Sequence, residues 1–173
     1  RWGTEDQLGC LNYITTERRR AAAALVREGV TVSASRALPT EEAPDNPHPA
    51  KHVMTSTGPD RQSMASGDYF GLSPHGYATT HLDALCHVFY KDAMYNGHSR
   101  ELVTPAGAEL NSIDALRGGI FARGVLLDIA RTKHRAWLEP REAIIPDDLE
   151  ESENFEGVRV QSGDFLLIRT GRF

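Results

Sequence analysis

Apolar and polar positions recur with two different periods along this chain, which predicts a mixture of helices and strands. A helix is predicted from Thr15 or Thr16, whose hydroxyl can cap its first turn, to about Glu28, and Gly29 supplies the stop. A second, small helix is predicted over 146–153. Between these helices the pattern changes to short apolar runs that are typical of strands.

Strands and short helices interleave, so we predict an α/β fold, with a mixed sheet rather than a purely parallel one. The run 124–129 is continuously apolar up to Asp128, which predicts a buried strand. The stretch from Leu38 to Pro59 is rich in proline and charge and predicts a long loop, mostly solvent-exposed, or an arm. The other predicted elements are strands at 30–34, 53–56, 67–77, 158–160 and 165–169, a helix over 82–89 and a helical turn over 112–116.

Length and composition narrow the class of protein. The 173 residues suffice for a single domain, 1–173, and because the chain stops directly after a strong strand we expect that domain to be incomplete at its C-terminus. A net charge of −5 without a large basic block argues against nucleic-acid binding. Two cysteines exclude a disulfide scaffold, and no apolar run reaches the ~20 residues of a membrane span. We therefore expect a cytoplasmic protein with no membrane partner.

The residues that carry chemistry are concentrated between Pro74 and His87. His75, His81 and His87 fall there with Asp83, and imidazole nitrogens and carboxylate oxygens are ligands for Zn²⁺, Mn²⁺ and Fe²⁺. In an extended segment His81 and Asp83 project to the same side. If a helix begins near Asp83, His87 at i+4 returns to that face. Chance clustering of polar residues in a loop is the alternative.

A nucleophilic Cys86–His87 pair is a further alternative. Adjacent residues of a helix point apart, so a hydrogen-bonded dyad is disfavoured, and a small core residue is the preferred interpretation of Cys86. Aromatic residues near the cluster, among them Phe70 and Tyr77, can line a flat pocket for an aromatic substrate, although plain core packing is favoured for Phe70. We assign no role to His48, His52 or His134.

Several ordered motifs resemble the cyclase family of metal-dependent hydrolases, which includes bacterial kynurenine formamidases and isatin hydrolases. The resemblance covers nearly the whole chain and is closest to a longer-chain branch often labelled only "putative cyclase". It rests on Trp2-Gly3-Thr4-Glu5-Asp6-Gln7-Leu8-Gly9, Thr79-Thr80-His81-Leu82-Asp83-Ala84-Leu85-Cys86-His87, Met94-Tyr95-Asn96-Gly97, Arg123-Gly124-Val125-Leu126-Leu127-Asp128 and Gly163-Asp164-Phe165-Leu166-Leu167-Ile168-Arg169-Thr170-Gly171.

The resemblance implies a swivelling β/β/α fold, one or two divalent ions (zinc or manganese) and hydrolysis of an amide, formamide or lactam C–N bond by a metal-activated water. Carried over, His81, Asp83 and His87 are metal ligands, and Asp83 and His87 also serve catalysis. The family's first ligand position falls on Tyr77, a departure from its pattern, and His75 two residues earlier can replace it as ligand or orient substrate. His75, Tyr77 and Phe70 are the predicted substrate-binding residues.

Further family residues, a His and a Glu, are expected beyond Phe173. The partners expected are a small-molecule substrate and further copies of the chain in a homo-oligomer. Two other functions stay open: a non-catalytic cyclase-like domain, which the Tyr77 departure favours, and a metal-dependent dehydratase or cyclase.

Overall fold

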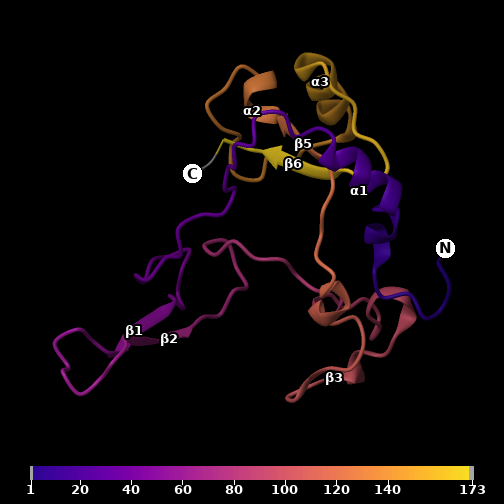
Figure 1. The fold of residues 1–173 in the computed structure, drawn as a ribbon. Helices are drawn as coiled ribbons and strands as arrows, with labels where there is room; N and C mark the ends of the chain where they lie inside the picture. Colours follow the sequence, from indigo (N-terminus) through magenta and orange to yellow (C-terminus); the bar gives the residue numbers. More distant parts are fainter. Residues whose placement is uncertain (1, 172–173) are drawn as a thin grey trace. The chain divides into compact units, whose positions relative to one another are not determined.

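The computed structural model describes residues 2–171, which form two compact units, Arg1–Gly29 with Leu85–Phe173 and Val30–Ala84. Helices and strands are both present, so the α/β class is confirmed in its coarse form. The described strands pair as three separate two-stranded sheets instead of one mixed sheet (Figure 1). Among residues 2–171 no helix has the length and apolar character needed to cross a bilayer.

The larger unit is built on a parallel strand pair. Strand β5 (Gly124–Asp128) lies beside β6 (Phe165–Arg169), with Gly124 opposite Phe165 and Asp128 opposite Arg169. Helices α2 (Ile129–Thr132) and α3 (Pro146–Glu156) pack near this pair (Figure 1). The core consists of Val125, Leu127, Ile129 and Leu138, with Ile144, Leu149 and Val158 packed against it.

The apolar run of β5 predicted a buried strand, and the structure corrects this in part. Val125 and Leu127 are 5% and 1% exposed, whereas Leu126 between them is 53% exposed. All five residues of β6 are exposed as well. Within the described residues the core therefore covers one face of β5.

A buried ion pair fixes the start of β6. The Asp164 side chain is 4% exposed and accepts hydrogen bonds from Nε and Nη2 of Arg123, the residue before β5. Asp164 also accepts from the backbone N–H of Gln161 at 2.6 Å. The Arg123 guanidinium lowers the pKa of the Asp164 carboxyl below its ordinary value. This ion pair joins the residue before β5 to the residue before β6, just ahead of the first paired residues of the two strands.

The N-terminal segment of the same unit is held by Asp6. Its carboxylate accepts from the Tyr95 hydroxyl at 2.6 Å, from Asn12 Nδ2 at 2.6 Å and from the backbone N–H of Gly9 at 3.0 Å. Asn96 Nδ2 donates to backbone carbonyls of this segment, including that of Asp6. The hydrogen bond to Asp6 raises the pKa of Tyr95 to about 12.

The smaller unit, Val30–Ala84, contains an antiparallel pair, β1 (Lys51–Ser56) and β2 (Gly67–Gly71), with Lys51 opposite Gly71. The strand predicted at 53–56 is thus confirmed, and so is the first half of that predicted over 67–77. From Leu72 to Ala84 the chain has no regular secondary structure. This segment carries the predicted metal ligands of the unit.

Other predicted elements differ from the structure. Helix α1 spans Thr16–Ala23 with Thr15 as its cap, so it ends well before Glu28. No strand forms at 30–34 or 158–160. The remaining elements are η1 (Gly9–Tyr13), η2 (Leu85–His87), η3 (Tyr95–Gly97), η4 (Arg100–Leu102), β3 (Val103–Thr104), β4 (Gly107–Ala108) and η5 (Ile113–Leu116).

Candidate metal centre

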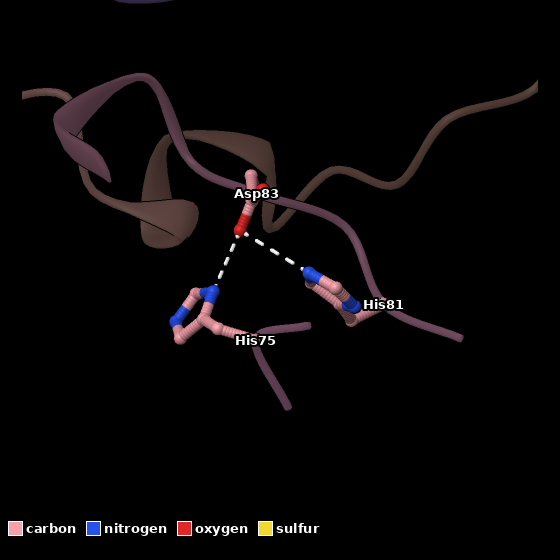
Figure 2. Close-up of side chains that lie close together, drawn as sticks. All are labelled: His75, His81 and Asp83. Atoms are coloured by element: carbon pink, nitrogen blue, oxygen red, sulfur yellow. Dashed lines mark ion pairs between the residues drawn. The ribbon is translucent and has the colours of Figure 1, made fainter. Parts of the chain in front are cut away.

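Three predicted site residues meet within the smaller unit. The carboxylate oxygen Oδ1 of Asp83 lies 2.9 Å from Nδ1 of His75 and 3.4 Å from Nε2 of His81. One ligand atom from each residue lies within 4.8 Å of the others, so the group can hold a metal ion. Figure 2 shows both imidazole rings directed at the carboxylate, with His75 arriving on a separate stretch of chain.

The local backbone explains the approach of His81 and Asp83. Residues 80–84 lack helical structure, so side chains two positions apart can project to the same side, as predicted from the sequence. His75 completes the group, and its ring meets that of His81 edge to face, with centroids 5.3 Å apart.

The backbone also fixes the tautomer of the neutral His81 ring. Its Nδ1 lies 2.8 Å from the carbonyl oxygen of Thr79. A carbonyl only accepts hydrogen bonds, so Nδ1 carries the proton, and in the neutral ring Nε2 presents its lone pair. That lone pair faces the Asp83 oxygen at 3.4 Å. Two acceptors facing each other at this distance require a proton or a cation between them.

The spacing fits a divalent ion. Ligand atoms about 2.0–2.1 Å from a tetrahedral ion stand about 3.3–3.4 Å apart. The His81–Asp83 separation of 3.4 Å has this spacing, and the His75–Asp83 separation of 2.9 Å is slightly shorter. A backbone carbonyl that orients a ligating imidazole through its other nitrogen is the usual support of such sites. The donor set of two imidazoles and a carboxylate suits Zn²⁺ or Mn²⁺ equally.

The structure leaves the predicted role of His87 untested. His87 lies in η2, which belongs to the other unit, so its role as a ligand and catalytic residue stays a prediction. The expectation that His87 returns to the face of Asp83 at i+4 required a helix beginning near Asp83. That helix was wrong, because no α-helix begins at Asp83. The three-residue turn Leu85–His87 replaces that helix, and the N–H of Cys86 donates to the carbonyl of Asn111. Cys86 itself is buried, as expected for a core residue.

The predicted substrate-binding residues lie in different places. Tyr77 is 92% exposed, and its role in binding substrate stays a prediction. Phe70 lies in β2 opposite His52 and is 50% exposed, not packed in a core. The sequence offered one signal for His75 as a ligand, its position two residues before Tyr77 in a non-helical segment.

Comparisons with known proteins identify the family of the chain. The sequence model of a family described as "Putative cyclase" matches residues 31–173. A solved structure described as the crystal structure of a novel cyclase is 32% identical, with a TM-score of 0.89. The match covers 98% of this chain and 60% of that one, so the chain spans well under two thirds of its solved relative. The comparison with curated proteins found no match. Since the family match spans most of the chain, the protein belongs to the putative cyclase family.

Proposed function

We propose that this chain is part of a metal-dependent hydrolase that breaks the C–N bond of a small amide, formamide or lactam. The metal would be Zn²⁺ or Mn²⁺, held by His75, His81 and Asp83, with His87 as the further ligand that the family resemblance implies. The observation that carries the proposal is the orientation of His81 by the Thr79 carbonyl, because it leaves a lone pair directed at a carboxylate.

The chemistry needs an electrophilic carbonyl and a nucleophilic water at neutral pH. A bound divalent ion supplies both, since it polarises a carbonyl oxygen and lowers the pKa of a coordinated water. The chain would contribute a fixed ligand geometry. The Thr79 carbonyl prevents the His81 ring from turning its other nitrogen inward, and Asp83 balances part of the positive charge. In the reaction the carbonyl carbon gains a water oxygen, the C–N bond breaks, and the amine leaves with a proton.

The family description gives a second candidate reaction. Closure of a lactam ring with loss of water is the reverse of lactam hydrolysis, so the same centre can serve either direction. A lactam substrate therefore tests this second reaction, because the lactam and its open-chain amino acid are linked by the same equilibrium.

The metal site is tested by measuring bound zinc and manganese in the purified chain after dialysis against each ion. We expect wild-type protein to retain a divalent ion and the variants His81→Ala and Asp83→Ala to lose it. His52→Ala is the matched control, because His52 lies 2.8 Å from Asp68 in an isolated histidine–aspartate pair without a third ligand. Loss of metal in all the variants, or in none, contradicts the assignment.

Hydrolysis is tested separately, in the full-length protein that contains this chain, on formanilide, an aromatic formamide, by following release of aniline and formate. Activity that needs the added ion and disappears in His81→Ala supports the proposed reaction. Metal retention without turnover of formanilide or a simple lactam would leave the binding site intact and refute the proposed hydrolysis.

A further inference from the structure

The proline-rich segment before β1 is a closed loop, because its two ends are joined by a hydrogen bond. The backbone N–H of Ala50 donates to the carbonyl of Pro39 at 3.1 Å, which brings the two ends of segment 39–50 together. Inside it, Ala43 and Asn46 exchange backbone hydrogen bonds at 3.2 and 2.8 Å. A loop closed at its base and braced at its tip has few conformations to lose when it binds something.

Asn46 holds this loop from within. Asn46 is only 6% exposed, and its Nδ2 donates to the carbonyls of Glu41 at 2.7 Å and Pro39 at 3.5 Å. Prolines at 44, 47 and 49 restrict the backbone further, because each ring fixes one φ angle. The next side chain after Pro47 is that of His48, which is exposed.

A cavity of about 240 Å³ separates this loop from the segment that carries the candidate ligands. Pro44, Pro47 and His48 line one side of it. Ser73, His75 and Tyr77 line the other. His75 therefore lines the cavity while its Nδ1 lies 2.9 Å from Asp83, so the cavity adjoins the candidate metal cluster. All these residues belong to the unit Val30–Ala84.

We propose that the closed loop 39–50 is the wall of the substrate pocket and that His48 is its specificity-determining contact. This inference rests on the proposed function, because it takes the His75–His81–Asp83 cluster as the reacting centre. His48 lines the cavity from the loop, and His75 lines it from the segment that carries the candidate ligands. The His48 ring can accept a hydrogen bond from the amide N–H of a substrate whose carbonyl group lies at the cluster.

The cavity also indicates the class of ligand. Its volume is smaller than the roughly 300–1,000 Å³ of pockets for drug-sized molecules, which favours a compact ligand of one ring. The flat faces of Pro44, Pro47 and Tyr77 suit a planar aromatic ring. A second cavity of about 460 Å³ shares Pro47, His48 and Ser73 with the first, so His48 stands where the two adjoin. Substituents of different length on the ring would pass beside this residue.

Binding of benzamide tests the inference without requiring turnover. In the zinc-loaded full chain, nuclear magnetic resonance should show benzamide shifting the backbone amide signals of Asp45, His48, Gly76 and Ala78. His48→Ala should weaken binding about tenfold, as expected for loss of one hydrogen bond and its packing, and His48→Gln should restore part of it. His52→Ala, a histidine of the same unit that lines neither cavity, should bind as wild type.

The outcomes separate the two proposals. Benzamide shifts at loop 39–50 that depend on His48, with no hydrolysis of formanilide, would refute the proposed reaction and support the pocket. Hydrolysis of formanilide with an unchanged KM in His48→Ala, and no benzamide shifts at 44–48, would overturn the pocket. A well-dispersed amide spectrum of His48→Ala establishes that the variant is folded.

Discussion

The buried pair between Arg123 and Asp164 offers a quantitative test of what holds the larger unit together. In Asp164→Asn the side chain keeps its size but loses its charge. Asp164 is 4% exposed at its side chain and receives three hydrogen bonds, two from Arg123 and one from Gln161. The substitution places an uncharged amide opposite a guanidinium that is itself only about a third exposed, at 34%.

The magnitude follows from the exposure of the two partners. Breaking a fully buried ion pair costs about 3–5 kcal/mol, and a hydrogen bond to a charged group contributes about 1.5–3 kcal/mol. Water can reach part of Arg123 and partly replaces the lost partner, so we expect a loss of about 2–3 kcal/mol at neutral pH.

The pH dependence has a definite sign. Arg123 lowers the pKa of Asp164 in the folded state, so the stabilisation is present above the unfolded carboxyl value near ~3.9. It is lost as the pH falls through the lowered folded value. The difference between wild type and Asp164→Asn should therefore shrink in acid.

Urea unfolding followed by tryptophan fluorescence measures this effect, since both tryptophans, Trp2 and Trp137, belong to the same unit as Asp164. Asp114→Asn is the control, because Asp114 pairs with Arg117 at 3.8 Å and the two side chains are 73% and 82% exposed. An exposed pair contributes at most about 1 kcal/mol. Equal losses in the two variants, or a gap that persists in strong acid, would refute the reasoning.

Two further predictions concern the same unit. Gly163 has φ +89, and a Cβ there would stand 2.6 Å from the carbonyl oxygen of Tyr13, so Gly163→Ala should destabilise by about 3 kcal/mol. Gly157→Ala has the same sign of φ but open space around it, and should cost about 1 kcal/mol in the same urea titration. Tyr95 should ionise at a pKa of about 12 in an ultraviolet titration, because its hydroxyl donates to Asp6, and Asp6→Asn should bring it back toward 10. The stabilisation that corresponds to this raised pKa is present below the ordinary tyrosine pKa and is lost as the pH rises through about 12. An unchanged tyrosine titration in Asp6→Asn would exclude this hydrogen bond in solution.

Local pattern predicted the elements whose cause is local. Thr15 caps α1 because its hydroxyl accepts from the N–H of Arg18, and the apolar run at 165–169 forms β6. The alternation around His81 and Asp83 predicted two side chains on one side of an extended segment. These features need only the residues within a few positions.

The elements that were wrong depend on distant residues. A helix over 82–89 was expected from its apolar spacing, but the N–H of Cys86 donates to Asn111, a residue far along the chain. The run 124–129 predicted a buried strand, whereas packing within the described residues covers Val125, Leu127 and Ile129 and leaves Leu126 exposed. Spacing along the chain does not say which face of a strand meets a partner.

The candidate site divides in the same way. The sequence by itself determined the donor set, because imidazoles and a carboxylate crowd into a short segment and the motifs around them resemble a metal-dependent family. Only the tertiary structure decided that the side chain of His75 lies close to those of His81 and Asp83. It also decided that His48 lines the same cavity as His75. Both depend on how an irregular segment and a proline-rich loop fold back on themselves, and neither has a periodic pattern that could reveal it.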